Sequence, residues 1–246
     1  MTGASSGIGR ELARQLAADG TELVVVARDG ERLRALADEV DVRCEVLVAD
    51  LADPSELSFV EERLRDRASP IDLLVNDAGI GSHGRFHELD LEREAVIVDV
   101  NVVALHRLAR VAAEVMVAAG GGGILNVSSM AGFLASPDTA TYSATKAFVT
   151  SLSESMHSGL APLGVHVSAL CPGFTRTEFQ QRADYDASSL PELAWQHADE
   201  VAAAGLAGIA ANRAVVVPGT LNKVGASVLS SLPRAARRLV VRTIRR

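Results

Sequence analysis

The chain is poor in the residues that mark several large classes of protein. It has only two cysteines, Cys44 and Cys171, far apart and without a CxxC pair, and only 4% of its 246 residues are aromatic. The isolated cysteines favour a reducing compartment, and the low aromatic content predicts a core of Val, Leu, Ile and Ala. No apolar run is long enough to span a membrane, and no segment resembles a secretory signal. We therefore expect a cytoplasmic protein, and the lack of aromatic-basic interleaving speaks against nucleic-acid binding.

Acidic residues are missing from the C-terminal part of the chain. The formal net charge is −7, yet no Asp or Glu follows Glu200, while eight Lys or Arg do, six of them arginines from Arg234 onward. Residues 221–246 also carry apolar side chains at roughly helical spacing, interrupted by Pro233: Leu221, Val224, Val228, Leu232, Leu239 and Val240. We predict that this basic amphipathic tail packs on the domain or on a neighbouring subunit of a homo-oligomer. Peripheral contact with an anionic membrane is the alternative.

Residues 1–220 have the pattern of a single domain, because no Pro/Gly/Ser-rich linker divides them. Short Val, Ile and Leu runs alternate with helical patterns, which is typical of a parallel sheet covered on both faces. The expected strands are residues 21–27, 44–50, 71–77, 122–128, 165–170 and 214–219. The expected helices are residues 11–20, 31–40, 55–66, 92–116, 142–156 and 199–211. Right-handed crossovers then give a doubly wound α/β fold of the Rossmann type, with ligands at the carboxyl ends of the strands.

A glycine-rich loop opens the chain. MTGASSGIGR places Gly3, Gly7 and Gly9 ahead of a helical pattern, an arrangement that can bring backbone amides against a phosphate. The same letters fit GxSxG, the nucleophile elbow of a hydrolase, with Ser5 as the nucleophile. That elbow needs a preceding strand, and only Met1 and Thr2 precede the loop. The phosphate loop is therefore favoured over the serine hydrolase.

The adenosine-binding position carries a base instead of an acid. About twenty residues beyond Gly7, where a dinucleotide fold uses a carboxylate for the ribose 2′-hydroxyl, the chain has Ala27 and Arg28. A guanidinium can bind a 2′-phosphate, which favours NADP over NAD. A solvated surface arginine is the alternative interpretation.

Tyr142 and Lys146 are four residues apart in TYSATKAFV, so a helix would place the phenol and the ammonium on one face. A neighbouring cation favours the phenolate, which makes the tyrosine a usable proton donor or acceptor. An ordinary solvated helix face would give the same spacing.

Several motifs occur together in a characteristic order: TGASSGIG, NDAG from Asn76 to Gly79, NVSS ending at Ser129, YSATK, and CPGFTRT from Cys171. This series resembles the short-chain dehydrogenase/reductase family from about residue 2 to about residue 220. Ser129 precedes Tyr142 by thirteen positions, as the family's catalytic pair does. The resemblance implies hydride transfer between NADP(H) and a carbonyl or alcohol of modest size.

The resemblance also implies roles for particular residues. Tyr142 would protonate the carbonyl oxygen, Lys146 would lower the tyrosine pKa and hold the nicotinamide ribose, and Ser129 would hydrogen-bond the substrate oxygen. Asn101 matches the asparagine that keeps a helix open for a relay water, which would also give its buried amide a partner. The cofactor-binding residues would be Gly3, Ser5, Gly7, Ile8, Gly9, Arg28, Asp50, Leu51, Asn76, Ala78, Gly79, Tyr142, Lys146, Pro172, Gly173, Thr175 and Thr177.

The chain departs from the family pattern in two places. Asp77 stands where many relatives have a second asparagine, which we interpret as a small change. The apolar strand that precedes TG in relatives is absent, and its loss would leave backbone groups of neighbouring strands unpaired. A start assigned too late is the favoured explanation. A natural truncation that leaves a catalytically inactive nucleotide-binding remnant, and another segment that fills the gap, are the alternatives.

The substrate is not specified by the sequence. Residues 178–200, which follow the PG motif, are polar and loop-like, and they suggest a mobile lid over the site. His83 and His87 are four residues apart, but no further ligand completes a metal-binding pattern, so we expect no metal.

Overall fold

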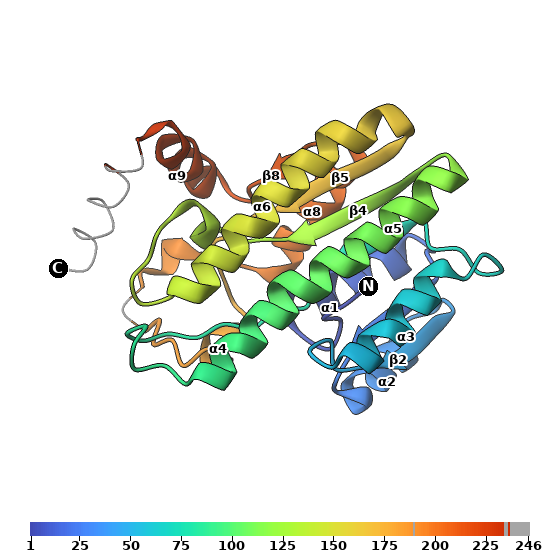
Figure 1. Ribbon diagram of the computed structural model, residues 1–246, viewed down its shortest axis with the longest axis horizontal. Coiled ribbons are helices and arrows are strands. Elements are labelled where there is room, and N and C mark those ends of the chain that lie inside the picture. Colours follow the sequence, from blue (N-terminus) through green and yellow to red (C-terminus); the bar gives the residue numbers. More distant parts are fainter. Residues whose placement is uncertain (189, 234–235, 237–246) are drawn as a thin grey trace.

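The computed structural model describes residues 1–188, 190–233 and 236, and it has the predicted doubly wound architecture (Figure 1). All strand pairs of the main sheet are parallel, in the order β2–β1 and β3–β4–β5–β8. The strands are β1 (Leu23–Ala27), β2 (Cys44–Val48), β3 (Leu73–Asn76), β4 (Gly122–Val127), β5 (Val165–Leu170) and β8 (Val215–Val216). The last is shorter than the predicted 214–219, because Pro218 lacks the amide that a longer ladder would require.

Helices cover both faces of the sheet (Figure 1). One face is covered by α3 (Pro54–Arg65), α5 (Leu105–Ala119) and α6 (Ala140–Leu160), and the other by α1 (Gly7–Ala18), α2 (Gly30–Glu39) and α8 (Ala198–Ala210). Because both faces are covered, strands β4 and β5 are buried almost along their whole length. The core is aliphatic, with Leu12, Leu36, Ile97, Leu125 and Leu170 among its fully buried side chains.

The sheet is nearly divided between β1 and β3, where the family would have a central strand. In the described chain only Met1 and Thr2 lie there: Thr2 forms isolated parallel bridges to Val26 and Asn76. The Met1 amino group donates to the Val24 carbonyl at 2.5 Å, and burial lowers its pKa to about 5. The short segment thus pairs only the carboxyl-terminal ends of both neighbours, and no other described segment fills the gap.

The long helix predicted over residues 92–116 is interrupted. The chain forms α4 (Leu91–Val98), a π-helical stretch from Asp99 to Ala104, and then α5. Asp90 caps the start of α4 by accepting from the Arg93 amide at 2.8 Å, and Gly120 ends α5 in a left-handed conformation. π-Helical turns are wider than α-helical ones and are frequent at functional sites.

The described residues of this polar segment, 178–188 and 190–200, contain regular secondary structure. They include α7 (Phe179–Arg182) and β7 (Trp195–Gln196), and β7 pairs with β6 (Phe174–Thr175) in a small second sheet. Ring contacts reinforce this pairing, because Phe174 lies 6.0 Å from Trp195 between centroids and stacks on Tyr185 at 5.8 Å. The segment therefore forms a cap with its own aromatic cluster.

Helix α9 (Thr220–Ser231) contains the described half of the predicted amphipathic tail. Ala226 is buried, whereas Leu221, Val224 and Val228 are 61%, 57% and 52% exposed. The remaining tail positions Leu239 and Val240, and the arginines from Arg234 onward, lie outside the described residues. Among the described helices, none is long and apolar enough to cross a membrane.

Candidate active site and dinucleotide cleft

A cleft of about 690 Å³ lies at the carboxyl ends of the sheet strands, where a doubly wound fold binds its ligands. It runs from the end of β1, past the loop before α1, to the first turn of α6 and to the cap formed by α7. The predicted site residues that line it are Gly3, Ser5, Gly7, Ile8, Arg28, Asp50, Leu51, Ala78, Gly79, Ser129, Tyr142, Lys146, Pro172, Gly173, Thr175 and Thr177.

The glycine loop is held by close backbone packing against the end of β3. A Cβ at Gly3 would lie 2.7 Å from the amide nitrogen of Ala78, and one at Gly9 would lie 2.4 Å from Oδ2 of Asp77. Both contacts are too short for any side chain, so these two glycines allow loop and strand to meet. Gly9 itself does not line the cleft, and its place in the site is one of packing.

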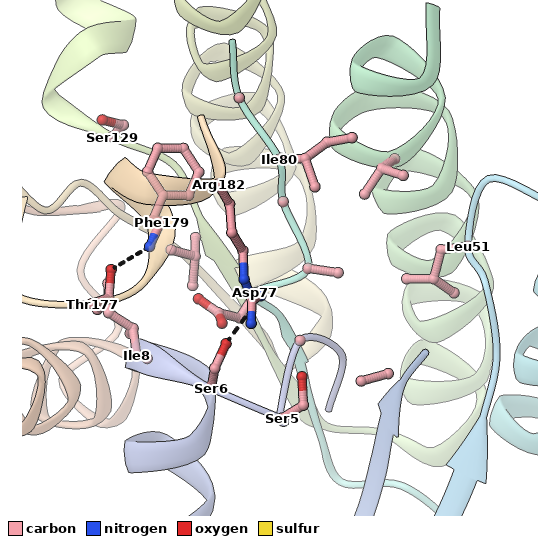
Figure 2. Close-up of a pocket in the computed structure, with 18 of the residues that line it drawn as sticks. Ser5, Ser6, Ile8, Leu51, Asp77, Ile80, Ser129, Thr177, Phe179 and Arg182 are labelled. Carbon is pink, nitrogen blue, oxygen red and sulfur yellow. Dashed lines mark hydrogen bonds between the residues drawn. The ribbon is translucent and has the colours of Figure 1, made fainter. Parts of the chain in front are cut away.

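Asp77 interacts with several groups of the site, although the sequence suggested only a minor substitution at this position. Its side chain accepts a hydrogen bond from the backbone of Gly9 and points into the cleft, beside Ser6 (Figure 2). Burial raises the pKa of Asp77 to about 8, although the positive charge of Lys146 and the Gly9 amide both oppose the rise. The carboxyl therefore titrates near neutrality at the entrance to helix α1.

At the end of the cleft formed by β1 and β2, Arg28 follows β1 and Asp50 follows β2, with 3.8 Å between Nη1 and Oδ2. Asp29, the nearest carboxylate in sequence, caps α2 by accepting from the Arg32 amide at 3.0 Å, and it also pairs with the Arg32 guanidinium at 3.3 Å. The one acid adjacent to the strand end is thus engaged with its own helix. Arg28 stays 65% exposed in its side chain and can turn toward an anion.

Ser129, Tyr142 and Lys146 meet at the opposite end of the cleft. Ser129 hydrogen-bonds Tyr142, and the Lys146 ammonium lies 5.8 Å from the centroid of the tyrosine ring. Lys146 donates to the Val127 carbonyl at 2.8 Å, which fixes it between β4 and α6. The predicted cluster of phenol, hydroxyl and ammonium is therefore assembled.

The pKa of Tyr142 does not follow the expected direction in this structure. Burial raises it to about 12, against the hydrogen bond of Ser129, and the charge of Asp77 adds to the rise. The Lys146 pKa is lowered to about 8, chiefly by burial, although attraction to Asp77 opposes the shift. The ammonium is aimed at a backbone carbonyl and not at the phenol oxygen, so desolvation outweighs its influence on the tyrosine.

Asn101 lies behind the cleft, fully buried within the π-helical turn. Its amide donates to the Ile80 carbonyl at 2.9 Å and to the Thr145 hydroxyl at 3.1 Å, and its oxygen accepts from the Ile80 amide at 3.0 Å. Protein groups therefore supply the partners for which a relay water had been expected. Asn101 therefore links the loop that follows β3 to helix α6, which carries Tyr142.

Asn76 also lies behind the cleft. Its amide donates to Asn126 at 2.9 Å, and Asn126 donates in turn to Ser153 at 3.0 Å, so the predicted cofactor residue belongs to a buried polar row across β3, β4 and α6. Oδ1 of Asn76 is buried and has no hydrogen-bond partner in the described chain.

The stretch after β5 forms the far wall. The Met130 amide donates to the Pro172 carbonyl at 2.9 Å, and the Gly173 amide donates to the side chain of Gln196 at 3.0 Å. The Thr177 hydroxyl accepts from the amide of Phe179 at 3.2 Å, which starts α7. These bonds turn the chain from the sheet into the cap.

Sequence reasoning missed the residues that the cap and the loop after β3 bring to the cleft. They are chiefly Asp77, Ile80, Gly81, Phe179, Gln180 and Arg182, and Ser6 of the glycine loop was missed as well. Phe179 packs on the Tyr142 ring at 5.3 Å between centroids, and Arg182 reaches toward the glycine loop (Figure 2). Ser6 and Asp77 lie within the motifs TGASSGIG and NDAG, whereas no short-range pattern marks Phe179, Gln180 and Arg182, which reach the site through contacts between distant segments.

Comparisons with known proteins agree with this arrangement. Residues 1–187 match the family model described as short chain dehydrogenase. A short-chain dehydrogenase from Sphingobium yanoikuyae, solved in complex with NADPH, is 38% identical with a TM-score of 0.84, and the match covers 96% of both chains.

Two further relatives have narrower descriptions. The bulky-bulky ketone specific alcohol dehydrogenase from Comamonas testosteroni is 33% identical with a TM-score of 0.79, covering 96% of this chain and 94% of that one. Oxidoreductase UcpA from Escherichia coli is 33% identical over 181 residues, which are 72% of this chain and 68% of the relative. The chain belongs to the short-chain dehydrogenase family of oxidoreductases, as its motifs predicted.

Proposed function

We propose that the protein is an NADP(H)-dependent oxidoreductase that interconverts a carbonyl and an alcohol of modest size. The observation that carries the proposal is the convergence of Ser129, Tyr142 and Lys146 at one end of a cleft whose other end presents Arg28. A dinucleotide is long enough to reach both ends. The volume of the cleft, about 690 Å³, suits a ligand of that size.

In this mechanism the chain supplies orientation and a proton, and the cofactor supplies hydride chemistry. Ser129 hydrogen-bonds the substrate oxygen, and the Tyr142 hydroxyl donates its proton to that oxygen during reduction or accepts one during oxidation. A Tyr142 pKa of about 12 keeps the phenol protonated at neutral pH, as the reductive direction requires. Lys146 adds positive charge beside the tyrosine ring.

The residues of the cleft fit NADP(H). Gly3 and Ser5 lie against the start of α1, where free amides favour a pyrophosphate. Arg28 would bind the 2′-phosphate, because Asp29 is occupied by the cap of α2 and Ala27 has no carboxylate. Asp50 would meet the adenine amine, Gly79 would lie along the adenosine side, and Thr175 and Thr177 would grip the nicotinamide side of the cofactor.

Replacing Tyr142 by Phe tests the proton transfer. We expect carbonyl reduction to fall by roughly 10²–10⁴-fold, the usual contribution of a positioned general acid, while NADPH affinity stays near that of the wild type. Steady-state kinetics on a panel of ketones and fluorescence titration of NADPH measure the two quantities. Tyr185→Phe is the matched control, since Tyr185 does not line the cleft. Undiminished turnover in Tyr142→Phe would contradict the assignment.

Replacing Arg28 by Ala tests the cofactor preference. The wild type should bind NADPH more tightly than NADH, and the variant should lose roughly tenfold or more for NADPH alone, the weight of a charge-assisted phosphate contact. Arg43→Ala is the control, because Arg43 precedes β2 at the opposite end of the sheet. Equal affinity of the unmodified protein for both cofactors would refute the preference.

One observation favours a second candidate, a nucleotide-binding protein without turnover: among the residues that the structure describes, only Met1 and Thr2 bridge β1 and β3. It would bind NADPH yet reduce none of the ketones, in the wild type and in Tyr142→Phe alike. The serine-hydrolase alternative has less support, because no histidine is found among the described residues that line the cleft beside Ser5.

We further propose that the protein is a cytoplasmic homo-oligomer in which the tail forms a subunit contact. An anionic membrane is the alternative partner of the tail.

A further inference from the structure

The cap contacts the glycine loop directly. Arg182, the last residue of α7, extends its guanidinium down into the cleft, with 3.4 Å between its Nη1 and the Oγ of Ser6 (Figure 2). Ser6 is the N-cap residue of α1, and its side chain makes no capping hydrogen bond. A cationic side chain from a segment remote in sequence therefore lies at the start of α1, where the Gly9 amide is bonded to Asp77 and Ser6 provides no side-chain cap.

The Arg182 guanidinium makes fewer and weaker hydrogen bonds than its five donors allow. Arg182 shares the Glu178 carboxylate with Arg32, which holds both carboxylate oxygens at 2.8 Å and 2.9 Å. Its contact with the neutral Ser6 hydroxyl is long for a hydrogen bond. An arginine has five donors, and a phosphate would satisfy them better than a shared carboxylate and a distant hydroxyl.

The other described cations of the cleft are placed for different tasks. Arg28 lies at the adenosine end, and Lys146 is fixed on the Val127 carbonyl at 2.8 Å. Arg93 holds α7 from behind, through Asp184 at 2.6 Å and the carbonyl of Arg182 at 2.8 Å. Of the described lysines and arginines that line the cleft, Arg182 is thus the one that contacts the glycine loop.

We propose that Arg182 is an additional cofactor-binding residue, which clamps the pyrophosphate from the cap side while the glycine loop holds it from below. This inference rests on the proposed function. Phe179 lies on the same turn of α7 and packs on the Tyr142 ring at 5.3 Å. A phosphate bound by Arg182 consequently fixes the aromatic wall beside the proton-transferring tyrosine, so cofactor binding shapes the substrate end of the cleft before the substrate arrives.

The test compares Arg182→Gln, Arg182→Lys and Arg28→Ala in the full chain, with NADPH and NADH as probes. Both cofactors contain the pyrophosphate, so Arg182→Gln should weaken both by the same factor, about tenfold, the loss expected for one charge-assisted contact. Arg28→Ala should weaken NADPH alone. Arg182→Lys should restore part of the affinity, because it keeps the charge but loses the fork.

Arg176→Gln is the matched control. Arg176 belongs to the same segment, pairs with Glu192 and lies 5.3 Å from the Trp195 ring, outside the cleft. It should bind both cofactors as the wild type does, and adenosine 2′-monophosphate should bind Arg182→Gln unchanged. Wild-type affinity of Arg182→Gln for NADPH would overturn the clamp, as would an equal loss for adenosine 2′-monophosphate. A wild type that binds neither NADPH nor NADH would instead overturn the proposed function.

Discussion

The carboxyl of Asp77 and the ammonium of Lys146 lie in the same part of the cleft, and burial acts on them in opposite directions. It raises the acid pKa to about 8 and lowers the amine pKa to about 8, while their mutual attraction opposes both shifts. The uncharged forms are therefore accessible near neutral pH. A proton that enters or leaves this pair changes the field at Tyr142, because the charge of Asp77 raises the tyrosine pKa.

Replacing Asp77 by Asn should change how stability depends on pH. Between about pH 4 and pH 8 the native carboxyl keeps a proton that the unfolded one has lost, so Asp77 lowers stability as pH rises through this window. The asparagine variant should be more stable at pH 8 by several kcal/mol, since one pKa unit corresponds to about 1.4 kcal/mol, and both proteins should converge near the acid end. Urea unfolding across the window measures the difference.

Asp72→Asn provides the control, since Asp72 is exposed just before β3. Parallel pH profiles of the wild type and Asp77→Asn would show that the Asp77 carboxyl is well solvated.

The motif alone did not indicate the raised pKa of Asp77, because a carboxylate in NDAG has the same size as the amide that it replaces. The effect of Asp77 depends on Gly9, because a residue without a side chain lets the start of α1 approach the carboxyl oxygen.

Secondary structure follows from sequence where local pattern decides, and it does not follow where distant contacts decide. The periodicity of residues 92–116 indicates a helix, but no hydrophobic period reveals that the turn around Asn101 widens into a π-helix. That widening depends on partners elsewhere in the chain, Ile80 and Thr145. The pairing of β6 with β7 is equally nonlocal, because Phe174 and Trp195 meet across twenty intervening residues.

Helix α9 has an exposed apolar row whose role can be tested. Leu221, Val224 and Val228 are all more than half exposed, so the described chain leaves this apolar row without cover. We expect it to pack on another subunit. A chain ending at Gly219 should then have a smaller oligomer size by sizing chromatography with light scattering, at low and at high salt.

Liposome flotation tests the membrane alternative on the same proteins. Attraction of the basic tail to anionic lipid would add on the order of 1 kcal/mol per basic residue and would fade with salt. A variant with Ser at the three apolar positions is the matched control, since it retains every arginine. Salt-sensitive flotation with an unchanged oligomer would contradict subunit packing, and no effect in either assay would mean that the tail contacts neither partner.

On the scale of the described chain, the sheet consists of two parts that Met1 and Thr2 connect. The doubly wound parallel sheet was predictable from the alternating pattern and right-handed crossovers, and so was the position of the cleft at the carboxyl ends of its strands. The gap was predictable too, because the motif TG follows a strand in relatives and follows only Met1 here. The arrangement around it was not predictable: Met1 places its amino group on the Val24 carbonyl, and α1 packs beneath on α8.

Adding an apolar strand of about five residues before Thr2 should stabilise the protein, because it would pair the free edges of β1 and β3. Each kcal/mol gained raises Tm by roughly 2–4 °C in a chain of this size. We expect a rise of several degrees by calorimetry. A Gly/Ser extension of equal length is the control, since it cannot bury apolar side chains, and equal Tm values for the two extended chains would contradict a vacant strand position.

The two ends of the cleft lie on different halves of the divided sheet. Arg28 and Asp50 follow β1 and β2, whereas Ser129 follows β4 and Tyr142 lies on α6. A ligand that touches both ends is a cross-link, and its binding free energy adds to the cohesion between the halves. Amide hydrogen exchange in β1 and β2 would then slow when the cleft is filled, so the strands farthest from the catalytic residues would report its occupancy.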